Sequence, residues 1–590
     1  MLYGITVFVL TVFAAQLVRV QVFDASAVQQ AALTKRQATV VLPAVRGQIV
    51  DSRGTVLATS VERRTITVNQ LAIAKYERVI DGKRVQVGAV GAAQRLAPLL
   101  GTTPEALVSE LVGTKPYTII AKGVTPLVWR DINAMGIPGV LSEVTFEREY
   151  PAGMSTAPLV GFVGSDGAGG GGLEYQYQRQ LAGTPGEEVY ERTKDGRVIP
   201  WGSQSTVPAT DGSTVRLTID ADLQWYAQNA LAAQVAHVGA KSGYVVVMEA
   251  KTGKLRAVAS YPSFDPGNVG RTRMGDLANP AFVDAYEPGS TGKVMSLSAA
   301  IEEKVVTPTT GVIVPNRIKR SDKTFKDHID HETQQLTVAG VLAKSSNIGT
   351  ILATEGVPAS TLDRYFRSFG IGAKTSVDFP GESAGLLATP DKLSGSQRYT
   401  VMFGQGYSLT SVQAAGVFQT IANGGVRVPP TLVESTTAAD GTVTPTPARE
   451  GIRVVSEPTA KQVSQMLEEV TLPGGTAPMV AIDGYRVAGK TGTANRYEDA
   501  AGGYSGYTVS FIGYAPADDP QFVVAVTVQK PALDSPGSGA ICGPVFKSVM
   551  TYALQAYQIP PNGAPSPTIP LTTTLGPGDP GVISDHRPNG

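Results

Sequence analysis

The chain has very few cysteines and histidines, and it carries no net charge. A single cysteine among 590 residues cannot form a disulfide within the chain. Cys542 lies in "GAICGPVF" among small apolar residues, which favours a buried, small hydrophobic side chain. Lysine plus arginine and aspartate plus glutamate number 50 each. This balance argues against a nucleic-acid-binding protein, which needs a basic surface.

The scarcity of histidine restricts the chemistry available to a serine nucleophile. A serine hydroxyl reacts poorly unless a base takes its proton, and the usual base is histidine. The chain has only His237, His328, His331 and His586, so a reactive serine is expected to use another base. His328 and His331 form an H-x-x-H pair in "KDHIDHE". Such a pair in a loop is usually solvated, and we expect neither a metal nor a cofactor.

Charge is also absent from the N-terminus. Met1 to Val18 contain no charged residue, and Arg19 is the first. This length is at the lower limit for a helix that spans a membrane. A cleaved signal peptide is the alternative, but it would need a basic N-terminal region, a shorter apolar run and a small-residue cleavage site. We therefore predict a retained membrane anchor over residues 1–20.

A chain of this length is expected to form two or more domains. Residues 21–209 begin with a polar helix and continue with short β-rich runs that are interrupted by the turn "DSRG". Helical segments follow between about 90 and 135, and four glycines at 169–172 form a loop. This part has no obvious catalytic cluster and is interpreted as a scaffold.

A second domain is predicted over residues 210–559. In "STVRLTIDADLQWYAQNALAAQVA" a strand leads into a helix. Two hairpins follow far apart, "GYVVVMEAKTGKLRAVASYP" and "YTVSFIGYAPADDPQFVVAVTVQK", with mostly helical segments between them. This order predicts an α+β fold whose antiparallel sheet is built from both ends of the domain. Residues 560–590 contain eight prolines and no apolar periodicity, which predicts a disordered tail.

The first chemical motif is S-x-x-K in "EPGSTGKVMSLSAA". Ser290 and Lys293 are three residues apart and would share one face of a helix that begins after the bend at Pro288. A serine in a first helical turn also has backbone N–H groups beside it that suit an oxyanion. A lone motif of this kind is more often a helix cap followed by an exposed lysine. Pro288 excludes the hydrolase elbow G-x-S-x-G.

Two further motifs favour the catalytic interpretation. Ser345 and Asn347 lie in "KSSN", a polar break between two helical segments, and Lys490–Thr493 ("KTGT") lies at the end of a β-like run. K-[ST]-G also occurs at Lys241 and Lys251, which flank the first hairpin and are interpreted as turns. In the order S-x-x-K, S-x-N, K-[ST]-G, the motifs are those of penicillin-binding proteins and serine β-lactamases.

The chain resembles a class B penicillin-binding protein, a monofunctional peptidoglycan transpeptidase, and most closely the division-specific branch of actinobacterial type. "RGQIVDSRG", "GGLEYQY", "AGTPGEE" and "FGQGYSLT" add to the resemblance. It implies a transpeptidase fold with an antiparallel five-stranded sheet, helices on both faces and a helical subdomain. It also implies an elongated, mixed α/β pedestal domain before this fold and an N-terminal transmembrane helix.

The resemblance implies a role for each motif residue. Ser290 would attack the D-Ala–D-Ala carbonyl of a stem peptide, with Lys293 as its base. Ser345 would relay a proton to the leaving group, and Asn347 would hold the substrate amide and Lys293. Lys490, with the hydroxyls of Thr491 and Thr493, would receive the substrate carboxylate. Gly492 would let the substrate backbone lie against the strand, and the N–H groups of Ser290 and Thr493 would form the oxyanion hole.

The resemblance also implies partners, and the motifs leave other activities open. β-Lactams would be covalent inhibitors, and a membrane glycosyltransferase of the SEDS family and division proteins would be partners, with the catalytic domain outside the cytoplasm. The alternatives are an elongation-specific transpeptidase, a carboxypeptidase or β-lactamase that uses water, and a membrane β-lactam sensor. Ser-Ser-Asn instead of Ser-Asp-Asn argues against a class A β-lactamase. A bifunctional glycosyltransferase is disfavoured, because the first 205 residues contain no histidine and none of the acidic motifs of that domain.

Overall fold

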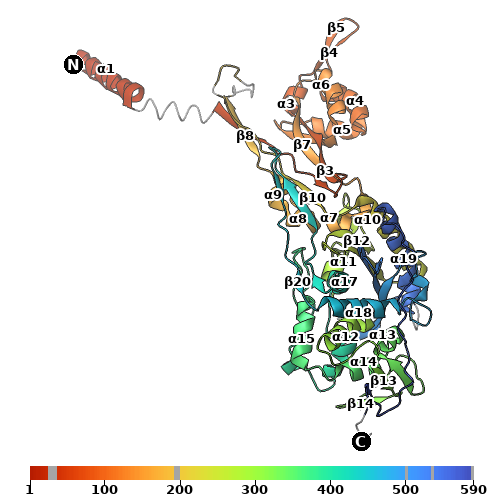
Figure 1. Cartoon of the computed structure of the whole chain (residues 1–590). Coiled ribbons are helices and arrows are strands. Elements are labelled where there is room, and N and C mark those ends of the chain that lie inside the picture. Colours follow the sequence, from red (N-terminus) through yellow and green to blue (C-terminus); the bar gives the residue numbers. More distant parts are fainter. Residues whose placement is uncertain (24–35, 192–198, 203, 499–501, 533–536, 586–590) are drawn as a thin grey trace.

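The computed structural model describes residues 1–23, 36–191, 199–202, 204–498, 502–532 and 537–585. From residue 36 onward the chain forms an elongated body (Figure 1). The strands and helices of the pedestal lie at one end, and helices α12 to α15 lie at the other.

The N-terminal helix α1, Leu2–Val18, continues into a short π-helical turn, Arg19–Phe23. None of its side chains is buried. The segment Leu2–Gln21 is long and apolar enough to cross a membrane. The hydroxyls of Thr6 and Thr11 donate to the backbone carbonyls of Leu2 and Val7, so these polar groups are satisfied within the helix. The predicted apolar helix is therefore present, and it is the one candidate membrane span among the described residues.

The pedestal is built on a seven-stranded sheet with the order β19-β18-β10-β2-β3-β6, in which β7 also pairs with β3. Helices α4, Gly88–Leu100, α5, Pro104–Leu111, and α6, Pro126–Ala134, enclose a separate small core around Leu96 and Ile66. The strands are β2 Ile49–Val50, β3 Val56–Val68, β6 Thr118–Val124, β7 Val140–Glu149, β10 Thr214–Leu217, β18 Val433–Thr437 and β19 Val443–Pro445.

This sheet crosses the predicted domain boundary at residue 210. Strand β10 follows that boundary, yet it pairs in parallel with β2 and antiparallel with β18. Asp51, just after β2, accepts from the backbone N–H of Ala221, and Arg53 pairs with Asp220 at 2.7 Å. The pedestal and the second domain are therefore joined by shared strands and by polar contacts, not only by a linker.

The second domain contains an antiparallel sheet in the order β12-β11-β23-β22-β21, as both predicted hairpins require. β11 and β23 pair along their full lengths, which brings the two ends of the domain together. Both the α+β class and the five-stranded sheet agree with the prediction. The strands are β11 Ser242–Glu249, β12 Leu255–Tyr261, β21 Ala488–Glu498, β22 Gly503–Ala515 and β23 Phe522–Gln529.

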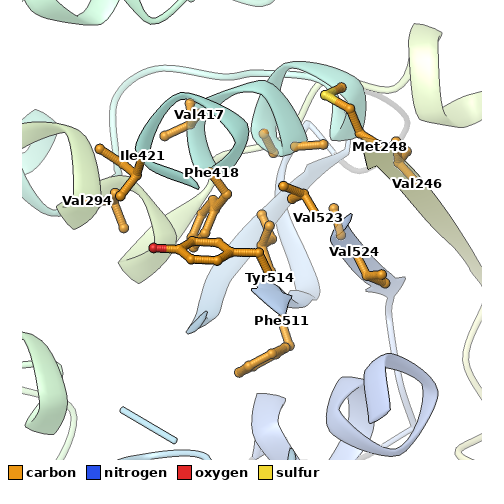
Figure 2. Close-up of a cluster of buried hydrophobic side chains, with 14 of the residues drawn as sticks. Val246, Met248, Val294, Val417, Phe418, Ile421, Phe511, Tyr514, Val523 and Val524 are labelled. Carbon is orange, nitrogen blue, oxygen red and sulfur yellow. The ribbon is translucent and has the colours of Figure 1, made fainter. Parts of the chain in front are cut away.

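Helices cover both faces of this sheet, which is why β23 is buried at every position. Figure 2 shows Phe418 of α17, Ser411–Ala422, packed over Tyr514, with Ile421 of the same helix beside Val294 and Phe511 pointing to the opposite side. There Phe511 meets Phe546 of α19, Ser538–Ala556, with ring centroids 4.7 Å apart. Helix α10, Ala221–His237, packs beside α19. Cys542 on α19 is fully buried, as predicted.

A helical subdomain extends from the sheet. Its central helix α12, Lys293–Glu302, is buried at every position from Lys293 to Ile301. It packs against α14 Asn347–Thr354, α15 Ala359–Ser368 and α18 Glu457–Glu468, while α13 Val338–Lys344 packs on α14 and α18. The helix that follows Ser290 is thus among the most enclosed parts of the fold.

The prediction that residues 560–590 form a disordered tail is wrong for residues 560–585. Strand β24, Val582–Ile583, pairs in parallel with β13, Gly311–Val314. Thr337 donates its N–H to Leu571 O at 3.0 Å and its hydroxyl to Pro570 O at 2.6 Å. Composition could not reveal this, because backbone bonds, one ion pair and a few scattered apolar side chains (Ile569, Leu571 and Ile583) hold the tail, without a regular apolar period. Residues 586–590 lie outside the described part.

The ion pair of the tail involves Arg320, whose side chain is only 1% exposed. Its guanidinium bonds to both oxygens of Glu355 and both oxygens of Asp585. A buried guanidinium needs such partners, and removal of one leaves part of its charge uncompensated.

Deletion of residues 569–590 should therefore lower the free energy of unfolding by about 2–4 kcal/mol, because Arg320 loses Asp585 and Thr337 loses two acceptors. Thermal unfolding of the full chain in detergent measures this, with deletion of 586–590 alone as the matched control. The control should melt like the intact chain. Equal melting temperatures for the two deletions would show that the tail contributes nothing.

Candidate active site

Ser290 lies in a 3₁₀ turn, Gly289–Gly292, that leads directly into α12. Gly289 has φ +53°, and a Cβ there would lie 2.5 Å from the carbonyl oxygen of Thr493. Glycine is therefore required for the turn to approach β21. Lys293 begins α12, and its Nζ lies 3.1 Å from Ser290 Oγ. The S-x-x-K spacing thus brings the two side chains together, as the sequence predicts.

Lys293 is fully buried, and its amine lies among oxygen atoms. Besides Ser290 Oγ, its Nζ lies 2.6 Å from the backbone oxygen of Ser345 and 3.3 Å from the Ser345 hydroxyl. Burial lowers the pKa of Lys293 to about 7, against a smaller opposing effect of Asp327. A neutral amine can donate to Ser345 O while its lone pair accepts the Ser290 hydroxyl proton. Lys293 can therefore act as the base that the histidine-poor sequence requires.

Ser345 lies at the end of α13, in the polar break that the sequence predicts. Its φ of +62° and ψ of +35° place it in the left-handed region, where it ends one helix before the next begins. Ser346 then caps α14 by accepting from Gly349 N at 2.8 Å. This backbone path directs the Ser345 hydroxyl between two amines, 3.3 Å from Lys293 Nζ and 3.0 Å from Lys490 Nζ.

Lys490 lies on β21 and is also fully buried. Its Nζ lies 3.1 Å from Thr491 Oγ1, and Thr491 Oγ1 lies 3.0 Å from Thr476 Oγ1. Burial, with a further contribution from the charge of Lys293, lowers the pKa of Lys490 well below its usual value. Neither amine is paired with a carboxylate within hydrogen-bond distance in the described residues, so nothing there offsets the effect of Lys293 on the charged form of Lys490.

Gly492 lies in close contact with the strand and the turn beside it. A Cβ at this position would lie 2.4 Å from Ser510 Oγ and 2.8 Å from Pro288 O. The missing side chain therefore lets β21 pack against the turn that carries Ser290. Thr491 and Thr493, on either side of it, line the cleft.

Asn347 lies in the same cleft as the other motif residues. Its Nδ2 donates to the backbone oxygen of Lys326 at 3.3 Å. No hydrogen bond joins Asn347 to Lys293 within the described residues, so the expected support of Lys293 by Asn347 is absent from this structure. Asp327, which belongs to no motif and was not predicted from the sequence, supports the backbone here: its carboxylate accepts from the N–H groups of Asn347 and Ile348.

Residues of all three motifs line one open cleft of about 1360 Å³, and the two buried lysines lie within hydrogen-bond distance of Ser345, which is one of these lining residues. Ser290, Ser345, Asn347, Thr491 and Thr493 line it, and Phe403 and Tyr507 add aromatic surface. A serine beside a buried base, a second amine and two threonine hydroxyls can support acyl transfer to the serine with recognition of a carboxylate. Within the described residues no group of three or more histidines, cysteines, aspartates or glutamates could hold a metal.

The two other K-[ST]-G matches lie at the surface, as predicted. Lys251 Nζ pairs with Asp519 at 2.7 Å, and both side chains are more than half exposed. Lys241 pairs with Glu498 at 3.1 Å. Both of these lysines are exposed, whereas Lys490 is fully buried, so burial distinguishes Lys490 from the other two matches.

Comparison with known proteins agrees with this geometry. The penicillin binding protein transpeptidase domain family matches residues 243–551, and the penicillin-binding protein dimerisation domain family matches residues 41–217. The chain belongs to the class B penicillin-binding proteins. The pedestal of this penicillin-binding protein thus corresponds to the dimerisation domain.

Individual relatives cover nearly the whole chain. Penicillin-binding protein PbpB of Mycolicibacterium smegmatis is 36% identical over 96% of this chain and 91% of its own length. Peptidoglycan D,D-transpeptidase FtsI of Escherichia coli is 32% identical over 88% of this chain and 84% of its own length. A peptidoglycan synthetase from Bifidobacterium adolescentis has a TM-score of 0.73 at 33% identity, covering 91% of this chain and 100% of its own.

One solved relative carries a bound β-lactam. Penicillin binding protein 3 from Mycobacterium tuberculosis, complexed with ampicillin, has a TM-score of 0.70 at 32% identity, and the match covers 91% of this chain and 100% of that one.

Lys490 and Lys251 make a matched test of the site in this penicillin-binding protein. Lys490→Ala should lower the rate constant of acylation by a fluorescent penicillin about a hundredfold or more, because a positioned hydrogen-bonding amine beside Ser345 and Thr491 is lost from the reacting centre. Lys251→Ala should leave it within a factor of about two, since a solvated hairpin lysine contributes little. Equal losses in both variants would contradict this assignment.

Proposed function

We propose that this penicillin-binding protein is a peptidoglycan D,D-transpeptidase that cross-links stem peptides during septal wall synthesis. The observation that carries the proposal is the meeting of Ser290, Lys293, Ser345 and Lys490 in one cleft, with Lys293 buried and its pKa lowered to about 7. The similarity to proteins named peptidoglycan D,D-transpeptidase supports the same reaction.

In the first half-reaction Ser290 Oγ attacks the carbonyl carbon of the penultimate D-Ala, and Lys293 takes the hydroxyl proton. Ser290 and Thr493 N–H groups stabilise the oxyanion, while Lys490, Thr491 and Thr493 hold the terminal carboxylate. The bond to the terminal D-Ala then breaks, and its nitrogen receives a proton by way of Ser345, which lies within 3.3 Å of both amines. The product is an ester on Ser290, and free D-Ala leaves.

In the second half-reaction an amine of a neighbouring stem peptide attacks the ester. Lys293 accepts the proton of the amine and returns it to Ser290, so the enzyme is regenerated and one new amide bond links the two peptides. A β-lactam follows only the first half, because ring opening leaves its nitrogen tethered to the acyl group. Binding of ampicillin by the mycobacterial relative supports this expectation.

The apolar helix α1 supports anchoring in the membrane, with the catalytic domain on the outer side, where peptidoglycan is made. The resemblance to the division-specific branch supports a septal role. It also supports a SEDS-family glycosyltransferase as a partner that contacts α1 and the pedestal. The large pedestal and the similarity over almost the whole chain favour a transpeptidase over a carboxypeptidase, a β-lactamase or a β-lactam sensor.

Ser290→Ala tests the proposal. The wild type should be labelled by fluorescent penicillin, and mass spectrometry should place the adduct on Ser290. With a D-Ala–D-Ala peptide and an amine acceptor, the main product should be the cross-linked amide. Ser290→Ala should lose labelling and transfer while its melting temperature stays unchanged.

Acylation of another serine, or hydrolysis without amide formation, would contradict the proposal. In cells, replacement of the native protein by Ser290→Ala should give filaments with failed septa. Bulging or rounding would instead assign the enzyme to elongation.

A further inference from the structure

Asp327 lies between strands β15, Lys323–Phe325, and β16, Gln334–Thr337, and is only 9% exposed. Its Oδ1 accepts from the backbone N–H groups of Asn347 at 2.5 Å and Ile348 at 3.0 Å. Its Oδ2 accepts from the Ser346 hydroxyl at 2.7 Å and lies 3.1 Å from His331 Nε2. One buried carboxylate therefore bonds to three consecutive residues.

These three residues directly follow Ser345. Asn347 and Ile348 begin α14, and Ser346 is its cap. The first N–H groups of a helix lack partners within the helix, and a carboxylate there also interacts favourably with the helix dipole. Asp327 thus accepts from two of these N–H groups. It also orients the Ser346 hydroxyl, which donates to Asp327 and accepts from Gly349 N.

The geometry of Ser345 requires such support. Its left-handed conformation is rarely adopted by residues with a side chain and persists only where the surroundings fix it. The same residue places its backbone oxygen 2.6 Å from Lys293 Nζ and its hydroxyl 3.0 Å from Lys490 Nζ. A small relaxation of residues 346–348 would move both oxygens away from the amines.

We propose that Asp327 is a positioning residue for acyl transfer: its carboxylate holds the break at residues 345–347 so that the Ser345 hydroxyl stays between Lys293 and Lys490. This inference rests on the proposed function and deepens it, since it assigns a device that orients the proton relay. The charge of Asp327 also acts on Lys293, because it raises the pKa of that amine against the effect of burial.

Asp327→Asn tests the proposal, and Asp330→Asn is the matched control. Asp330 belongs to the same loop, but its side chain is 67% exposed and pairs with Arg317. With the full chain in detergent, the acylation step with fluorescent penicillin is measured separately from initial binding. Asp327→Asn should slow the acylation step about tenfold and change binding little, because orientation and not recognition is lost. Asp330→Asn should change either constant by less than about twofold.

Two further readouts separate positioning from loss of stability. In a Ser345→Ala background, Asp327→Asn should slow acylation by less than about threefold, since the two residues act through one group. The midpoint of the rate against pH should also move down in Asp327→Asn. Lys490 is the other amine beside Ser345, and Asp327 is the charged group that raises the pKa of Lys293 against burial, so removal of its negative charge favours the neutral amine. A purely structural defect would slow acylation equally with and without Ser345, and it would leave the pH midpoint unchanged.

The outcomes are distinguishable from failure of the proposed function. If the wild type is not acylated, the proposed function fails. If the wild type is acylated, the proposed function stands, and either of two results overturns the proposal for Asp327. One is an Asp327→Asn variant with the acylation rate and pH midpoint of the wild type. The other is an Asp327→Asn change that slows acylation as much in the Ser345→Ala background as in the wild type. If Asp327→Asn does not fold, Ser346→Ala removes one contact of the carboxylate: an acylation step slowed about threefold supports the proposal, and an unchanged one overturns it.

Discussion

The burial of two lysine amines beside one serine hydroxyl is the constraint on which the rest of the site depends. Lys293 and Lys490 are both fully buried, and the Ser345 hydroxyl lies 3.3 Å and 3.0 Å from their Nζ atoms. Two charged amines this close in a poorly solvated site would repel each other, so at least one is driven toward the neutral form. A neutral amine is what Ser290 requires as a base, and the fold supplies it without histidine.

The fold keeps this arrangement by bringing three distant segments together. Pairing of β11 with β23 closes the sheet from both ends of the domain, which places β21 and Lys490 at its edge beside the Ser290 turn. Gly289 and Gly492 allow the turn and the strand to touch. The buried helix α12 fixes Lys293, and the left-handed conformation of Ser345 places its hydroxyl between the two amines. Each motif is thus short, while its geometry depends on a large core.

Sequence patterns predicted the parts of this structure that depend on local chemistry. The alternating apolar runs around "KTGK" and "ADDP" predicted both hairpins, and the S-x-x-K spacing predicted the contact of Ser290 with Lys293. Features set by distant partners were missed. Asp327 belongs to no motif, the tail is held by Arg320 and Thr337 far away in the chain, and the close packing of Gly492 against Pro288 joins two segments that lie far apart in the sequence. The pedestal sheet takes strands from both sides of the predicted boundary for the same reason.

The most direct test of this account is the titration of Lys293 itself. With lysines labelled with ¹³Cε and ¹⁵Nζ, NMR of the full chain in detergent should show a signal that changes near pH 7 and is absent from Lys293→Met. Below that pH the amine is protonated and cannot act as the base; above it the base is available. A Lys293 signal that stays protonated up to about pH 10, the ordinary lysine value, would contradict the account.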